Sequence, residues 1–127
     1  MQREKDNFLL VSMPERKVKI PFSSIVFVES IQRKLHVYLD GGDKLCGKTL
    51  RMPFEKAAIP LLQDSRFLHA HKSYILNMSL VTELTKRSFI MKNGVEIHIP
   101  KYKYSDAKNK YLDYLSANGI GLLGGEQ

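Results

Sequence analysis

The densest group of chemically capable side chains lies in the run RFLHAHKSYILN at residues 66–77. Basic, imidazole and hydroxyl groups alternate there with apolar residues, and His71, Lys72 and Ser73 follow one another. Such a mixture is typical of a strand edge that meets an anion, because the apolar positions can pack inside while the ammonium group stays outside. Asn77 suits a turn, since its side chain can satisfy the backbone beside it.

Other basic residues fall where predicted elements end, so that their side chains can reach outward. Arg33 and Lys34 lie in a polar connection, and His36 follows shortly after them. The planar fork of Arg33 can match a pair of acceptors such as O6 and N7 of guanine. A wider cationic set comprises Lys48, Arg51, Lys86 and Arg87, of which we expect Lys48 and Lys86 to be secondary phosphate contacts.

Composition indicates a single domain and favours a polyanionic partner. Its 127 residues are 43% hydrophobic, which is enough for one packed core and too few for two ordinary domains. We therefore expect a single domain over residues 1–127, with an ordered core at about 8–117 and a Gly-rich tail at 119–127. The net charge of +7 favours nucleic acid or an acidic membrane surface as the partner.

The residues needed for enzyme chemistry are hard to assemble. The four histidines, His36, His69, His71 and His98, have neither paired cysteines nor close acidic ligands in the sequence. No Gly-rich phosphate loop precedes a helix, and the acidic residues are dispersed. We therefore predict no catalytic residue, no metal site and no cofactor.

The sequence also predicts a cytoplasmic location. Cys46 is the single cysteine, so it cannot form an internal disulfide, which favours a reducing compartment. Residues 1–12 lack the apolar core of a signal peptide, and no apolar stretch approaches the roughly 18 residues that span a bilayer. We expect no membrane partner.

Short alternating segments separated by turn signals predict a mainly β fold. The expected strands are residues 8–11, 18–20, 25–30, 35–39, a strand through Cys46, 80–84, 88–91 and 95–99. Asn93-Gly94 predicts a hairpin with a type I′ turn, in which both residues have positive φ. Apolar spacing predicts a central helix at residues 53–62, which Pro60 must distort or shorten, and a C-terminal helix at 101–115.

The order of these pieces resembles the LytTR family of bacterial DNA-binding domains. HKSYILN at residues 71–77 resembles the family signature, in which a His, a basic residue and a Ser precede a hydrophobic pair and an Asn. IVFVES at 25–30 looks like the family's hydrophobic strand ending in Glu, and a loop, a second strand, an Asp-Gly turn and KTL at 48–50 follow. The resemblance covers residues 12–115. It implies an elongated arrangement of short antiparallel sheets with a short central helix and a C-terminal helix.

The resemblance also implies sequence-specific binding of double-stranded DNA through loops that enter the major groove. In the loop after Glu29, the resemblance implies that one of Arg33 and Lys34 reads a base and the other binds phosphate. Arg33 is our first candidate for the base, and His36 is a third candidate if the loop is shifted by one or two residues. Lys72 occupies a central DNA contact, with His71 in a structural role and Ser73 bonding to phosphate or backbone. The third contact precedes the last helix and is Lys101 or Lys103, where Lys in place of the usual Arg weakens the case for bidentate base recognition.

A separate expectation concerns how Lys72 is held. Tyr74 and Leu76 lie on the strand from which we expect Lys72 to emerge, so its reach is short and backbone phosphate is its expected partner. A base contact stays open from the resemblance. The segment 71–73 should lie between the other two contact regions.

The expected partners follow from the same resemblance. Family members are commonly the output module of a two-component response regulator, so a receiver domain is a partner if this chain is a fragment. A domain of this size covers a limited site, so two copies should bind repeated half-sites, with a homodimer on DNA as one form. The competing function is a β-barrel module for RNA, single strands or protein, with Tyr38, Tyr74, Tyr102 and Tyr104 as stacking platforms. An enzyme ranks third.

Overall fold

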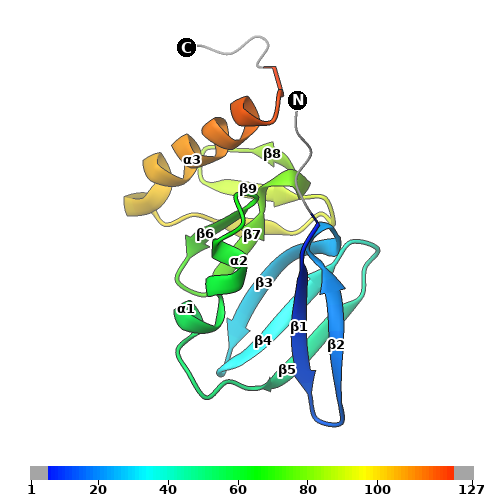
Figure 1. Cartoon of the computed structure of the whole chain (residues 1–127). Helices are drawn as coiled ribbons and strands as arrows, with labels where there is room; N and C mark the ends of the chain where they lie inside the picture. Colours follow the sequence, from blue (N-terminus) through cyan, green and yellow to red (C-terminus); the bar gives the residue numbers. More distant parts are fainter. Residues whose placement is uncertain (1–5, 122–127) are drawn as a thin grey trace.

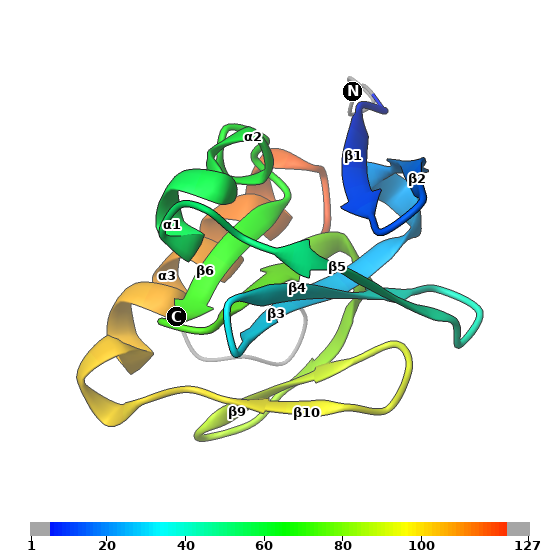
Figure 2. The same cartoon turned by 90° about the horizontal axis from the view of Figure 1, so that it is seen from below.

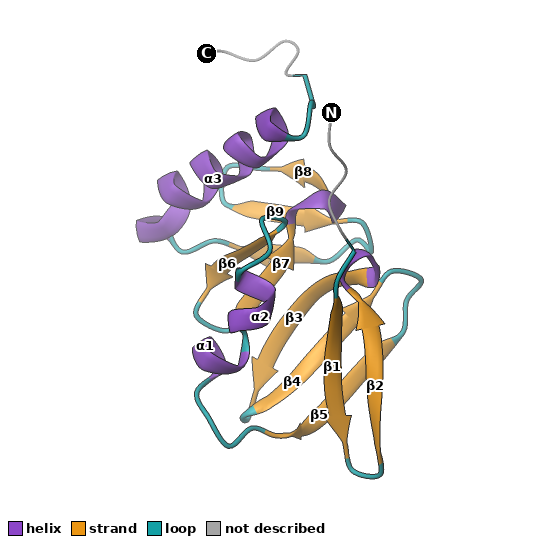
Figure 3. Ribbon diagram, in the orientation of Figure 1, coloured by secondary structure: helices purple, strands orange, loops and turns teal. Residues whose placement is uncertain are grey.

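The computed structural model describes residues 6–121, and the last residues of the predicted Gly-rich tail, 122–127, lie outside them. The fold is mainly β, as predicted, and successive short sheets make it elongated (Figures 1 and 3). The strands are β1 (Phe8–Met13), β2 (Arg16–Pro21), β3 (Ile25–Ile31), β4 (Lys34–Leu39), β5 (Lys44–Thr49), β6 (Phe67–His71), β7 (Tyr74–Asn77), β8 (Val81–Leu84), β9 (Ser88–Met91) and β10 (Glu96–His98). The helices are α1 (Phe54–Ala57), α2 (Ile59–Leu62) and α3 (Tyr104–Ala117), with 3-10 turns η1 (Phe22–Ser24), η2 (Met78–Leu80) and η3 (Lys101–Lys103).

Every strand pairing within the described residues is antiparallel. β1 and β2 form a separate hairpin, the central sheet has the order β5-β4-β3-β7-β6, and the third sheet has the order β10-β9-β8. The central sheet therefore brings β3 beside both β4 and β7, although about forty residues of chain separate β3 from β7. This crossover positions the tips of two hairpins next to each other.

The central sheet is buried on both faces, because neighbouring residues of a strand point to opposite sides. Val28 and Ile75 face one core and their neighbours Phe27 and Leu76 face the other. The first core lies against the β1–β2 hairpin, α1 and α2, and the second against β8–β10 and α3 (Figure 2). Such layers on both faces hold the sheet rigidly, which fixes the direction of its loops.

The helices follow the prediction with one correction. Residues 53–62 form two short helices instead of one, because Pro60 lies in the first turn of α2 and cannot continue the hydrogen bonding of α1. α3 begins at Tyr104 and ends before Asn118, whose backbone bonds to Tyr114 O and Leu115 O. Gly119 follows with a φ of 75°, as is typical of a residue just after a helix.

The type I′ turn lies at a different place from the one predicted. At the β9–β10 hairpin, Gly94 has a φ of 87°, whereas Asn93 is not among the residues with positive φ. A backbone bond from Met91 N to Val95 O closes a three-residue loop instead, and Gly94 N donates to Met91 O within it. Gln32 and Arg33, with φ of 50° and 66°, form the two-residue turn between β3 and β4. Such turns fit the twist of the flanking strands, although neither residue is a glycine.

The run at residues 66–77 is a hairpin and not one strand edge. β6 and β7 pair antiparallel, with His71 opposite Tyr74. Lys72 and Ser73 therefore form the turn at the tip, and the expectation that Lys72 emerges from a strand was wrong. Its side chain is exposed at this tip.

Candidate nucleic-acid interface

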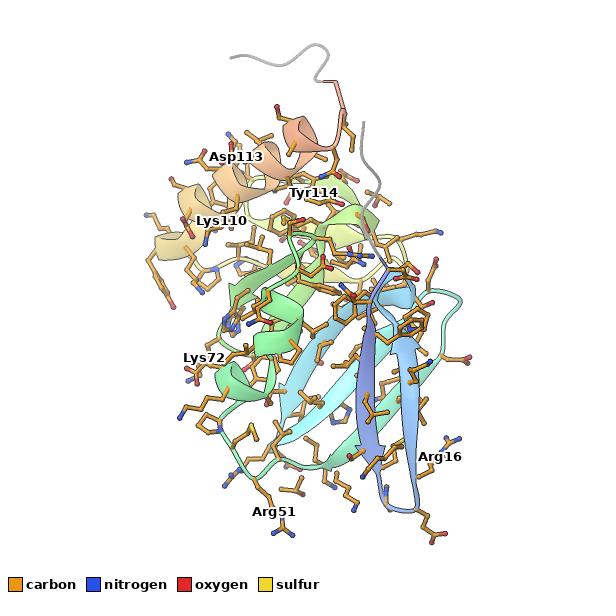
Figure 4. All side chains as sticks on the ribbon, in the orientation of Figure 1. Arg16, Arg51, Lys72, Lys110, Asp113 and Tyr114 are labelled. Carbon is orange, nitrogen blue, oxygen red and sulfur yellow. The ribbon has the colours of Figure 1, made fainter. Side chains whose placement is uncertain are left out.

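Four loop regions lie along one edge of the domain. They are the β3–β4 turn, the β6–β7 turn, η3 with the start of α3, and the β8–β9 turn, on the left in both views (Figures 1 and 2). Lys72 projects from the middle of this edge, with Arg51 below it (Figure 4). We call this set of loops the basic edge, because each of them carries exposed Lys or Arg side chains.

Hydrogen bonds tie three of these loops side by side. Ser30 N, near the end of β3, donates to Ser73 O at 2.9 Å. Lys103 Nζ, in η3, donates to His69 O on β6 at 3.3 Å. The β6–β7 turn is therefore the middle member, with the β3–β4 turn on one side and η3 on the other. Residues separated by up to seventy positions in the sequence form one continuous edge.

Arg33 is exposed at the β3–β4 tip but is not a freely extended side chain. Its Nη2 donates to Leu50 O at 3.2 Å, and Leu50 N donates to Arg33 O at 2.6 Å. These bonds fix the turn against the chain between β5 and α1. Because an exposed hydrogen bond of this kind contributes only about 1 kcal/mol, the Arg33 side chain can exchange it for another partner at little cost.

Lys34, Lys48 and Arg51 surround a shallow hollow on one flank of the edge, together with Pro14, Cys46, Gly47 and Thr49. His36 lies beside this hollow, half-buried within β4 and not in the loop. Its Nε2 is 3.8 Å from Cys46 Sγ, and its buried Nδ1 has no partner among the described residues. His36 is therefore positioned as part of the sheet, while the three cations are open to a ligand.

A second basic hollow lies at the other flank, between the β8–β9 turn and the start of α3. Its lining is Lys86, Arg87, His98, Ile99, Lys101, Tyr104 and Ser105. Tyr104 Oη donates to Thr85 O at 3.1 Å, and Ile99 N donates to Arg87 O at 2.7 Å. These bonds hold the turn against η3. Sequence reasoning missed His98 as a member of this hollow. In the β9–β10 hairpin His98 pairs with Ser88, and this register brings it near Lys86.

The histidines near Lys72 hold the hairpin tip in shape. His71 Nδ1 accepts a hydrogen bond from Ser73 N at 3.1 Å, and His69 Nε2 lies 3.4 Å from Lys72 O. Burial lowers the pKa of His69, so its ring is neutral at pH 7. Both rings therefore support the loop by hydrogen bonding to its backbone.

The opposite end of the domain has a different charge character. Asp40 and Asp43 lie at the β4–β5 turn, where Asp40 forms an ion pair with Lys92 at 3.0 Å. This end therefore carries charges of both signs, whereas the charged side chains of the β3–β4, β6–β7 and β8–β9 turns are all Lys or Arg.

Three of the four tyrosines proposed as stacking platforms are engaged elsewhere. Tyr38 stacks on Phe27 with ring centroids 4.2 Å apart and donates to Glu29 at 3.2 Å. Tyr74 is half-buried, and burial together with a hydrogen bond to Glu29 raises its pKa. Tyr104 is half-buried and bonds to Thr85. Only Tyr102 among the four is fully open, at 83% exposure.

Comparison with known proteins agrees with this geometry. A family model described as the LytTr DNA-binding domain matches residues 15–111, about three quarters of the chain. The chain belongs to the LytTR family. Its members are defined by a DNA-binding domain and not by an enzymatic activity. The family assignment from the motifs at residues 25–30 and 71–77 is thereby confirmed.

A solved structure also resembles this LytTR domain. It is the LytTr DNA-binding domain of a protein described as a methyl-accepting/DNA response regulator from Bacillus cereus. The two share 21% sequence identity with a TM-score of 0.62, and the match covers 87% of this chain and 98% of that one. At this identity the match establishes the shared fold. A search of curated proteins found no match.

Residues 6–121 also bear on metal binding and membrane insertion. No group of three or more His, Cys, Asp or Glu side chains in this range is placed to hold a metal ion. Within the same range, no helix has the length and apolar character needed to cross a membrane.

Proposed function

We propose that this LytTR domain binds double-stranded DNA in a sequence-specific manner, with the loops of the basic edge entering the major groove. The observation that carries the proposal is the hydrogen-bonded alignment of the β3–β4 turn, the β6–β7 turn and η3 on a single edge. Loops at the two ends of such an edge can enter successive major grooves, while the middle loop meets the phosphates between them.

The geometry suggests a division of roles along the edge. Arg33 is assigned to base reading, with Lys34 and Lys72 on phosphates and Ser73 beside them. At the third site we favour Lys101 over Lys103, because the Lys103 ammonium already donates to His69 O whereas Lys101 is exposed. Lys48 and Lys86 extend the phosphate contacts on the two flanks, and His36 is the weakest member of the predicted set because the sheet half-buries it.

We also propose that the domain is the output module of a cytoplasmic two-component response regulator that controls transcription. Support comes from the structurally similar Bacillus cereus protein, which is described as a response regulator. A receiver domain would then be its partner within one protein. Selection of bound duplexes from a random pool by the purified chain tests the central claim, since a domain without sequence preference enriches no common site.

We expect the affinity for duplex DNA to fall steeply with salt. If about six phosphates are neutralised, counterion release predicts a loss of roughly a thousandfold between about 50 and 200 mM salt. Fluorescence anisotropy with a labelled duplex measures this slope. The Lys92→Ala variant, altered at the opposite end, should keep the same slope, and an affinity independent of salt would remove the proposal.

We expect two copies to bind a tandem site more tightly than one copy binds a half-site. A single domain contacts too few base pairs for useful specificity, and two linked sites add their discrimination. Electrophoretic shifts on duplexes with one and two half-sites, separated by one helical turn, make the comparison. Equal affinity per copy on both duplexes would show that the domains bind independently.

A further inference from the structure

Tyr102 is an unusual residue on the basic edge. Its exposure of 83% is the highest among the exposed large hydrophobic side chains of the described residues, where Leu10 follows at 60%. No hydrogen bond or ring contact of Tyr102 is found within residues 6–121, whereas Tyr104 two positions later is anchored to Thr85. The ring is therefore not part of the core, and its removal should cost the fold little.

The local backbone holds this ring out from the edge. Tyr102 is the middle residue of η3, a single 3-10 turn that follows Pro100 and leads directly into α3. On its two sides, Lys101 is exposed and Lys103 is tied to His69 O. A ring in this place is presented by a fixed turn, between cations that attract DNA.

We propose that Tyr102 is a specificity-determining residue that packs its ring against the C5-methyl group of a thymine in the major groove. This inference rests on the proposed function and names a base for its third contact region. Lys101 and Lys103 cannot read a base through a planar fork, because each ammonium is a point charge. An aromatic ring supplies what they lack, and the thymine methyl is the apolar group that the major groove offers to such a contact.

The test uses the duplex selected by the wild-type chain. Each of its thymines is replaced in turn by deoxyuridine, which removes the methyl group and keeps the base pair. Burial of one such group corresponds to ~0.8 kcal/mol, so we expect about a fourfold loss of affinity at one thymine. Tyr102→Ala should bind the thymine duplex about as weakly as the wild type binds that deoxyuridine duplex, and it should not respond further to the replacement.

Two variants test whether the effect is due to the aromatic ring of Tyr102 itself. Tyr102→Phe keeps the ring and should keep the response to deoxyuridine, whereas Leu10→Ala, an exposed apolar residue on β1, should bind both duplexes like the wild type. Thermal unfolding should show equal stability for all of them, because both positions are exposed.

The results that would refute the role of Tyr102 differ from those that would refute the proposed function. If the wild type selects no duplex, the proposed function fails and the inference with it. If it selects a site but no thymine responds to deoxyuridine, or Tyr102→Ala keeps the full response, only the role of Tyr102 is refuted. A response that Tyr102→Phe loses would assign the contact to the hydroxyl group and would also refute packing on the methyl.

Discussion

Asn77→Ala is expected to lower the free energy of unfolding by roughly 3 kcal/mol, because a buried polar group that loses its partner costs about 1–3 kcal/mol. Asn77 is fully buried at the end of β7. Its Nδ2 donates to Ile25 O at 2.9 Å and to Phe22 O at 3.3 Å. Its Oδ1 accepts from Ser79 N and Ser79 Oγ at 2.9 and 2.6 Å. One amide thus joins η1, β3 and η2.

Urea unfolding followed by circular dichroism measures this loss. Asn93→Ala is a matched control, because Asn93 is exposed and its Oδ1 bonds only to Val95 N within the described residues. We expect the control to lose less than about 1 kcal/mol, as for an ordinary surface hydrogen bond. Equal losses in the two variants would show that the network around Asn77 does not stabilise the fold.

Asn77→Asp adds a test of the donor side of that network. An ionised carboxylate would face the carbonyl oxygens of Phe22 and Ile25, so this variant should be less stable than the alanine variant at pH 7. Repulsion raises the pKa of the carboxyl group in the folded state, so its protonation favours folding. The stability of this variant relative to the wild type should therefore rise as the pH falls from 7 toward 4.

The β9–β10 hairpin and most of the strands could be predicted from sequence, since they depend on local alternation of apolar and polar residues, whereas the β6–β7 hairpin was expected as a single strand edge. The turn assignments show the limit of such local signals. Asn93-Gly94 has the preferred composition for a type I′ turn, yet the loop at that place has three residues. Gln32 and Arg33 have no such composition, and the bond from Leu50 N to Arg33 O helps to hold their positive φ. A contact seventeen residues away thus outweighs propensity.

The basic edge could be predicted as separate basic loops but not as an assembled surface. Its assembly depends on the pairing of β3 with β7 and on the docking of η3 against β6, both of which join distant parts of the chain. The expected order, with residues 71–73 between the loop after Glu29 and the segment before the last helix, is the order in which the hydrogen bonds place these three segments. The partners of individual side chains, such as Leu50 O for Arg33, could not be read from local sequence at all.

Arg33 and Lys72 are expected to differ in how their loss changes DNA binding. A bidentate contact from Arg33 to guanine contributes roughly 1–3 kcal/mol of discrimination against a wrong base, a factor of about 5–150. Removing the Arg33 side chain should therefore flatten the preference at one base position. Lys72 projects from the middle of the edge, where phosphate is its expected partner, so Lys72→Ala should weaken all duplexes alike and reduce the salt slope by about one unit.

The choice of substitution at Arg33 follows from its backbone. At a φ of 66°, Arg33→Ala keeps the strain of the turn, whereas Arg33→Gly relieves it, because glycine accepts positive φ readily. Loss of specificity in Arg33→Gly therefore reports on the side chain and not on a damaged loop. Arg33→Lys keeps the charge without the planar fork, and it should bind scrambled duplexes like the wild type while losing preference for the selected site.

Affinities of these variants for the selected duplex, for duplexes changed at single positions and for a scrambled duplex decide between the two roles. Lys92→Ala at the opposite end should match the wild type on every duplex, since an exposed ion pair contributes little. If Arg33→Gly weakens selected and scrambled duplexes by the same factor, Arg33 contacts phosphate and another residue reads the base. If Lys72→Ala instead changes the base preference and leaves the salt slope unaltered, the middle of the edge is a reading element and the two roles must be exchanged.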